Sequence, residues 1–302
     1  MELRQLRSLV ALVEAELSVT RAALRLNLVQ SAVSQHLKQL EEELGVRLFH
    51  RSGKRLAGLT AAGEQVVHYA RSTLADAANI LAIGRDHRSD DTGVLRIGTT
   101  HTQARYVLPP AIRRFRALYP QVEIQLHQDT PRQLAEMAVQ DLVDLVICTE
   151  VIGDHAALTA LPCYRWNRVL IAPHGHPLLD ARPLTLELLC AHPIITYVAG
   201  FTGRGRLSDS FAKEGLRPRV VLAAADTDVI KTYVREGLGL GIIADLAWQA
   251  REDTDLGVRD LSHLFPSELT RVAHLRERYL RRFQQRFLDI LQEEAARVTR
   301  RR

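Results

Sequence analysis

Residues 18–64 contain the pattern that most limits what this chain can fold into. Behind Ser18, which is suited to cap a helix, apolar residues recur at helical spacing as Val19, Ala22, Ala23 and Leu26. Residues 27–29 break the pattern, and a longer amphipathic segment over 30–44 carries Val33, Leu37, Leu40 and Leu44 on one face. Gly45 is a typical helix stop. Two helices joined by three or four residues predict a helix-turn-helix.

The polar face of the second predicted helix favours DNA as its partner. Hydroxyl, amide and ammonium groups reach base edges and phosphates in a major groove. The candidate contacts on this helix are Ser31, Ser34, Gln35 and Lys38. For His36, a phosphate contact and a solvated side chain are equally good interpretations.

A basic segment follows over residues 46–59 and predicts two short strands around Ser52–Gly53. Such charges often form only a solvated surface, but their position beside the two helices favours contact with a phosphate backbone. We therefore add Arg51, Lys54 and Arg55 to the DNA-binding candidates. An opening helix over 3–13 is expected to pack beneath this module.

A long helix is expected from Thr60, a capping residue, to about Gly84, with Glu64 favoured in its first turn by the helix dipole. Its apolar stripe consists of Val66, Val67, Ala70, Leu74, Ala77, Ile80, Leu81 and Ile83. Because the sequence shows no core for this stripe, we predict that it pairs with a second copy in a dimer. The polar residues 85–93 are expected to form a hinge.

Composition sets wider limits. The 302 residues suffice for two or three domains, and 46% hydrophobic with 25% charged residues is typical of a soluble globular protein. The net charge of +5 permits nucleic-acid binding without requiring it. No apolar run approaches the roughly 18 residues of a membrane span, and residues 1–5 lack the apolar core of a signal peptide. We expect a cytoplasmic protein with no membrane partner.

Three cysteines, Cys148, Cys163 and Cys190, are too isolated for a disulfide framework or a CxxC pair. This usage favours a reducing compartment and buried, inert thiols. Redox sensing by Cys148 or Cys163 is the alternative, but no basic helix start lies beside them.

From Val94 onward, strand and helix patterns alternate. Strands are expected over 94–98, 122–126, 142–149, 169–172, 194–197, 219–223 and 240–243, and helices over 104–118, 131–140, 183–189, 205–214, 228–237 and about 277–298. The alternation predicts an α/β domain with parallel strands. A ligand of such a domain binds at the carboxyl ends of the strands.

Hydroxyl and amide side chains mark these strand ends. Thr100, Thr102 and Gln103 lie between a strand and a helix start, where free N–H groups favour an anion. Thr149 ends another strand, and Thr202 precedes a helix. Neutral donors bind a small oxyanion or carboxylate without a buried, unpaired cation. Simple helix capping by these threonines is an equal alternative. Trp166 is either a wall of the site or a core residue.

Other motifs point away from catalysis. Gly237–Gly241 resembles a dinucleotide fingerprint, but it follows a helix and enters a strand, which favours a turn. Only one residue separates His174 from His176, and prolines flank them, which favours a surface turn over a metal site. No nucleophile elbow or acid–base pair stands out. We therefore expect no enzyme activity, no metal and no cofactor other than an effector. A transport-type binding protein is a further alternative, disfavoured by the DNA-binding module.

The first 64 residues resemble the winged helix-turn-helix of LysR-type transcriptional regulators. The matching positions are Ala22–Ala23, Gln30, Val33–Ser34, Leu37, Leu40–Glu41, Leu44–Gly45, Leu48–Phe49, Arg51, Thr60 and Gly63. Two positions depart from the pattern, since family members usually have Ser or Thr in place of Val29 and Pro in place of Ser31. Ser31 fits the same first helical turn.

Four blocks of the remaining chain resemble one branch of this family, the CysB/Cbl subfamily. They are residues 99–106, 161–168, 200–204 and 226–235. The resemblance implies an α/β fold class: a mostly α winged helix-turn-helix, a long linker helix and a two-lobed α/β effector domain similar to periplasmic binding proteins. The expected domains are 1–59, 60–88 and 89–302, with lobe I over about 89–162 and 270–302 and lobe II over about 163–269.

The subfamily regulates genes of sulfur assimilation and cysteine biosynthesis. The resemblance implies that sulfate or an acetylserine-type anion binds at Thr100, Thr102, Gln103, Thr149 and Thr202. Expected partners are double-stranded promoter DNA, a second copy joined through the linker helix, a homotetramer and RNA polymerase. A regulator of another small-anion pathway, such as alkanesulfonate use, is the alternative, and an enzyme acting on a small anion is the least favoured.

Overall fold

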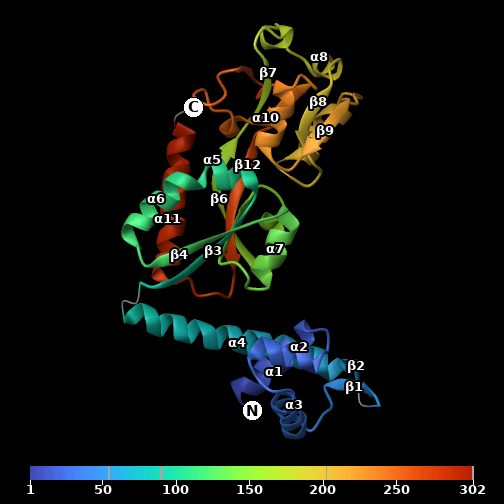
Figure 1. Cartoon of the computed structure of the whole chain (residues 1–302), viewed down its shortest axis with the longest axis vertical. Helices are drawn as coiled ribbons and strands as arrows, with labels where there is room; N and C mark the ends of the chain where they lie inside the picture. The colour runs from blue at the N-terminus through green and yellow to red at the C-terminus, as the bar shows by residue number, and fades with distance from the viewer. Residues whose placement is uncertain (54, 89–90, 202, 301–302) are drawn as a thin grey trace. The chain divides into compact units, whose positions relative to one another are not determined.

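The computed structural model describes residues 1–53, 55–88, 91–201 and 203–300 of the chain (Figure 1). The chain divides into two compact units, residues 1–89 with 277–279 and residues 90–276 with 280–302. None of the helices in the described ranges combines the length and the apolar character needed to cross a membrane.

The first unit begins with three helices and a hairpin. They are α1 (Leu3–Glu14), α2 (Val19–Leu26), α3 (Gln30–Leu44), β1 (Phe49–Ser52) and β2 (Arg55–Leu59). The Ser18 hydroxyl accepts a hydrogen bond from the N–H of Arg21 at 3.4 Å, and Gly45 ends α3 in the left-handed conformation. These elements confirm the predicted helix-turn-helix and its hairpin. Leu9 and Leu12 of α1 are buried beneath them, together with Val33 of α3.

The long helix α4 (Ala61–His87) corrects two expectations. Thr60 caps it as predicted, accepting from the N–H of Gly63 at 3.0 Å. However, its first half does have a core, because Val67 and Ala70 pack with the N-terminal helices. Only its second half leaves the stripe open, with 69% of Ile80 and 59% of Leu81 exposed. The helix also continues past its expected end at about Gly84 to His87, and so takes in the first residues of the segment expected to form a hinge. Basic Arg85 and His87 in its last turn are favoured there by the helix dipole.

The second unit contains two five-stranded sheets. The first has the order β4-β3-β5-β12-β6, with bounds Val122–Gln128, Gly93–Thr99, Leu145–Cys148, Glu268–Leu275 and Leu158–Trp166. The second has the order β11-β7-β10-β8-β9, with bounds Leu256–Asp260, Arg168–Pro173, Leu240–Ala244, Ile194–Tyr197 and Val220–Ala224. This architecture confirms the α/β class.

Both sheets are mixed, whereas we expected parallel strands. β3 pairs in parallel with β4 and β5, and β8 does so with β9 and β10. By contrast, β12 runs antiparallel to β5 and β6, and β7 runs antiparallel to β10 and β11. The sequence pattern misses β6, β11 and β12, because polar residues interrupt the apolar alternation on which strand prediction depends.

The described part of this unit contains seven α-helices: α5 (His101–Tyr106), α6 (Leu108–Leu118), α7 (Pro131–Val139), α8 (Leu186–Cys190), α9 (Arg204–Lys213), α10 (Thr227–Arg235) and α11 (Arg282–Arg300). Short 3₁₀ turns lie at Ile152–Asp154, Pro177–Leu179 and Asp245–Ala247. The single helix expected over 104–118 is therefore two helices. Pro109 and Pro110 lack the N–H groups that would continue a helix across Val107. α11 begins later than expected, since residues 277–279 belong with the first unit.

The strand β5 shows why helices cover both faces of the first sheet. Leu145 and Ile147 belong to the core that α6 and α11 share, whereas Val146 and Cys148 belong to the core under α7. Figure 1 shows α6 and α11 along one side of this sheet and α7 on the other. Because both faces are filled, ligand-binding groups are left to the strand ends.

Candidate functional site

Two predicted site segments begin at the same edge of the first sheet. β3 and β5 are parallel neighbours, and the Thr99 hydroxyl donates to the Ile147 carbonyl at 3.0 Å. Thr100 and Thr149 follow the ends of these two strands. The register therefore brings the two threonines to one edge, although 48 positions separate the bonded strand ends.

The residues at the start of α5 are buried polar groups. Thr100 is 3% exposed, and Thr102 and Gln103 are 1% exposed. The Thr100 hydroxyl donates to the Gln103 side-chain oxygen and makes no cap bond to the helix backbone. The capping interpretation is therefore wrong for Thr100, while its role in ligand binding stays a prediction.

Thr102 takes part in a hydroxyl chain that reaches the second sheet. Its Oγ1 lies 3.4 Å from Oγ1 of Thr227, which lies 2.8 Å from the Tyr197 hydroxyl. Tyr197 in turn accepts from the N–H of Ala244 at 3.2 Å. Sequence reasoning missed Thr227 and Tyr197. Thr227 is the first residue of a helix that follows a strand, and this position, shared with other predicted site residues, could have identified it from the sequence.

Thr149 lies beside Trp166. Its Oγ1 is 3.1 Å from Oγ1 of Thr270 and accepts from the indole N–H of Trp166 at 3.4 Å. Trp166 is 1% exposed, and the Arg168 guanidinium lies 5.4 Å from its ring centroid. Trp166 is thus both a core residue and a direct neighbour of a predicted site residue.

Thr202 lies outside the described residues, but the following residue, Gly203, is described. The Gly203 N–H donates to the carboxylate of Glu150, which directly follows Thr149. Burial raises the Glu150 pKa to about 6, although the bond from Gly203 acts to lower it. Glu150 was not predicted from the sequence, because a carboxylate repels an anion and only neutral donors at the strand ends indicate an anion site.

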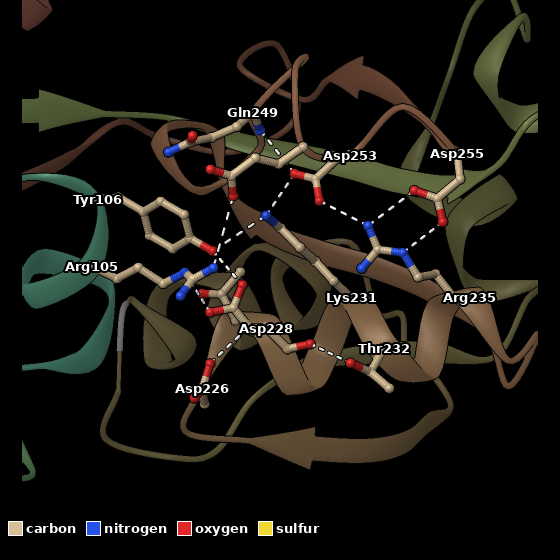
Figure 2. A network of polar contacts seen from close by, with 12 residues as sticks. Arg105, Tyr106, Asp226, Asp228, Lys231, Thr232, Arg235, Gln249, Asp253 and Asp255 are labelled. Carbon is tan, nitrogen blue, oxygen red and sulfur yellow. Dashed lines mark hydrogen bonds and ion pairs between the residues drawn. The ribbon is translucent and has the colours of Figure 1, made fainter.

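A charged network joins the two halves of the second unit (Figure 2). Arg105 Nε lies 2.7 Å from an oxygen of Asp228, and the Tyr106 hydroxyl donates to the other oxygen at 2.6 Å. Lys231 is 2.6 Å from Asp253 in a buried ion pair, and its Nζ also donates to Tyr106 at 3.3 Å. The short helix α5 therefore carries predicted site residues at its start and this network at its end.

In the described ranges, one group of three side chains has the spacing of metal ligands: His101, Asp226 and Asp228 have donor atoms within 4.8 Å of one another. Asp228 is already held by Arg105 and Tyr106, as above. The two histidines of the 174–176 segment lie in a turn, where His174 Nε2 is 2.9 Å from the Thr254 carbonyl.

Local structure decides between the alternatives for the glycine-rich segment 237–241 and for the cysteines. Gly237–Gly241 follows α10 and enters β10, which confirms a turn rather than a dinucleotide loop. Burial raises the pKa of the Cys163 thiol to about 12 and that of Cys148 still further, which disfavours the reactive thiolate. These surroundings favour inert thiols over redox sensors.

On α3, the candidate DNA contacts Ser31, Ser34, Gln35 and Lys38 are all exposed. Lys38 lies 3.4 Å from Glu42, in a solvent-exposed pair that leaves it available to a phosphate. The His36 Nδ1 lies 2.8 Å from the Ser8 hydroxyl and links α3 to α1, and the ring is half-buried, so a phosphate contact or solvation of its other nitrogen stays a prediction.

On the hairpin, Arg51 is 3.2 Å from Glu41, whose other oxygen accepts from the N–H of Leu48 at 2.7 Å. Lys54 lies outside the described residues, and the side chain of Arg55 is not among those described. Glu41 thus positions Arg51, which lies one residue pair from the turn of the hairpin.

Comparison with known proteins adds independent support. Residues 3–64 match the bacterial regulatory helix-turn-helix of the lysR family, and residues 88–296 match the LysR substrate binding domain. The transcriptional regulator CysB of Burkholderia cenocepacia is 41% identical over 291 residues, covering 96% of this chain and 93% of that protein. The regulator SsuR of the same organism is 41% identical over 290 residues, covering 96% and 94%.

Among solved structures, the cofactor-binding domain of the Cbl transcriptional regulator is similar, with a TM-score of 0.65 and 41% identity. The match covers 70% of this chain and 94% of that domain. Both modules thus match LysR family models, and the relatives match nearly the full length of the chain. The chain therefore belongs to the LysR family of bacterial transcriptional regulators, and it is a DNA-binding regulator of the CysB/Cbl type rather than an enzyme.

Proposed function

We propose that this chain controls genes of sulfur assimilation and cysteine biosynthesis in response to a small anion. The effector, sulfate or an acetylserine-type molecule, binds at Thr100, Thr102, Gln103, Thr149 and Thr202. The observation that supports the proposal is the burial of the Thr100, Thr102 and Thr149 hydroxyls at one edge of the first sheet. The chain is also 41% identical to a CysB regulator. Neutral donors at a strand end suit an anion, because they bind it without a buried, unpaired cation.

DNA binding uses α3 and the basic hairpin of a dimer. The exposed Ile80 and Leu81 of α4 form an apolar face that a second copy covers. Two recognition helices then meet two half-sites of a promoter. A homotetramer and RNA polymerase complete the proposed set of partners.

Effector binding acts by shifting a conformational equilibrium. Thr102 lies in α5, which follows β3 of the first sheet, and Thr227 begins α10, which packs on the second sheet. Their hydroxyl oxygens lie 3.4 Å apart, so a ligand at this edge interacts with both helices. A ligand that binds one relative arrangement of the sheets more tightly shifts the population toward it.

The test is a footprint of the full-length protein on promoters of sulfur-uptake and cysteine-synthesis genes, with and without sulfate, thiosulfate and the acetylserine isomers. We expect protected half-sites whose extent changes with at least one effector. A Thr102→Val variant should keep the footprint and lose the effector response, whereas Thr159→Val on β6 should keep both. A footprint indifferent to every one of these metabolites contradicts the effector half of the proposal.

A regulator of another small-anion pathway, such as alkanesulfonate use, is a second candidate. The chain is equally identical, at 41%, to two differently named regulators, CysB and SsuR, so identity alone does not select one pathway. Adding an alkanesulfonate to the same panel separates the two, since the preferred effector is the one that changes the footprint at the lowest concentration.

A further inference from the structure

Glu150 directly follows Thr149, a predicted site residue, after the end of β5. Its carboxylate accepts a hydrogen bond from the N–H of Gly203, the N-cap residue of α9. Gly203 leaves no room for a side chain, since a Cβ there would meet Arg168 and Glu268. The carboxylate therefore occupies a backbone N–H at a helix N-terminus, and such N–H groups commonly bind anions.

The backbone around Glu150 is held in an uncommon conformation. Val151 has φ 74° and ψ −48°, and the N–H of Ile152 donates to the Glu150 carbonyl at 2.9 Å, closing a three-residue turn. The Cys148 thiol donates to the same carbonyl at 3.2 Å. A positive φ is unfavourable for a β-branched residue and persists where the surroundings impose it. The turn thus positions Glu150 rather than leaving it free.

The charges facing Glu150 do not neutralise it. Arg168 of β7 and Glu268 of β12 are both 2% exposed and lie 2.7 Å apart, so they largely satisfy each other. Arg206 of α9 is 3.2 Å from Glu268 and not paired with Glu150. Within the described ranges, no ion pair involves Glu150. Arg168 attracts Glu150 while Glu268 repels it, so an entering anion would meet a negative charge that has no ion-pair partner of its own among the residues described.

We propose that Glu150 is an internal competitor of the anionic effector and decides which effectors the site accepts. In the free protein its carboxylate occupies the Gly203 N–H, and the effector anion displaces it. This inference rests on the proposed function of the same site.

Two routes relieve the repulsion between Glu150 and the effector. A simple dianion such as sulfate binds together with one proton, which neutralises the carboxyl group. The pKa of about 6 makes that proton available at moderate cost near neutral pH. An effector with an ammonium group, such as O-acetylserine, binds without proton uptake, because its own cation pairs with the carboxylate. Glu150 thus favours amino-acid effectors over simple oxyanions as the pH rises.

The experiment is calorimetric titration of the full-length protein with sulfate from about pH 5 to about pH 8.5, in two buffers of different ionisation enthalpy. Above the Glu150 pKa, the sulfate affinity of the wild-type protein should fall up to about tenfold per pH unit, with uptake of about one proton per sulfate. In Glu150→Gln, sulfate affinity should be independent of pH, with no proton uptake. O-acetylserine should bind this variant about tenfold more weakly than wild type.

The matched control is Glu123→Gln, an exposed carboxyl group on β4, which should behave as wild type. Thermal unfolding checks that each variant is folded, and the wild-type titration is informative without any variant. Sulfate binding with no pH dependence and no proton uptake overturns the role of Glu150 and leaves the proposed function intact. Proton uptake that persists in Glu150→Gln also overturns it. Failure of the wild-type protein to bind any of these anions contradicts the proposed function instead.

Discussion

The hydroxyl of Tyr106 donates a 2.6 Å hydrogen bond to Asp228 and so joins α5 to α10. α5 follows a strand of the first sheet, and α10 packs on the second. Burial, the largest cause, raises the pKa of Tyr106, and the contact with Asp228 raises it further. The phenol therefore keeps its proton and remains a donor. Because Thr102 and Gln103 lie in the first turn of α5, one helix connects the proposed effector residues to the link between the sheets.

Tyr106→Phe removes this donor and keeps the ring. We expect a loss of about 2 kcal/mol in the free energy of unfolding, since a hydrogen bond to a charged group is lost while Arg105 still pairs with Asp228. Urea unfolding of the full chain measures it. The control is Tyr233→Phe, which removes the hydroxyl of a partly exposed tyrosine on α10 and should change the free energy of unfolding by less than about 0.5 kcal/mol. Equal stability of wild type and Tyr106→Phe would show that this hydrogen bond makes no net contribution to the free energy of unfolding.

Glu150 should make stability depend on pH. Its pKa is raised from 4.5 to about 6, so folding disfavours the ionised form. The protonated group contributes full stability below about pH 4.5, and that contribution is lost as the pH rises through about 6. Glu150→Gln should therefore gain up to about 2 kcal/mol relative to wild type between acidic and neutral pH. Urea unfolding at several pH values checks this, and a difference that stays constant with pH would refute it.

Two substitutions on α3 should separate phosphate contact from base recognition. Lys38→Ala should weaken binding to all DNA sequences. The slope of log affinity against log salt concentration should become shallower by about one, because about one fewer counterion is released. Gln35→Ala should cost about 1–3 kcal/mol on the operator and little on unrelated DNA. Fluorescence anisotropy at several salt concentrations measures both. Lys213→Ala, an exposed lysine at the end of α9, is the control and should leave DNA affinity unchanged. Identical losses on operator and unrelated DNA for Gln35→Ala would argue against base contact.

The exposed end of α4 should control dimer formation. Leu81→Glu places a charge in this apolar face, and because Leu81 is 59% exposed in the isolated chain, folding of the monomer should be unaffected. Dimer affinity should fall about tenfold or more, because burial of the leucine in the interface is lost. Sedimentation across a concentration series gives the dissociation constant. Ser72→Glu, on the same helix and also exposed, is the control. A dimer of wild-type strength in Leu81→Glu would place the interface elsewhere.

Local signals explain which parts of the fold were predictable. α3 begins and ends at the residues expected from its apolar spacing and from Gly45, and Thr60 caps α4 as expected. The strand β8 likewise matches its predicted bounds. The break at Val107 was missed because apolar spacing continues across it, while Pro109 and Pro110 carry the opposing signal. The limits of the three expected domains, the effector residues and the cytoplasmic location stay predictions.

The sequence by itself determined the winged helix-turn-helix, the alternating α/β order and the strand-end positions of Thr100 and Thr149, because periodicity, caps and glycine stops act over a few residues. Only the tertiary structure decided what those residues face. The bond between Glu150 and Gly203 spans 53 positions, and that between Tyr106 and Asp228 spans 122. No local pattern encodes the partner of a polar side chain across such distances. Sheet pairing and burial choose it, and burial then sets the charge state of groups such as Glu150.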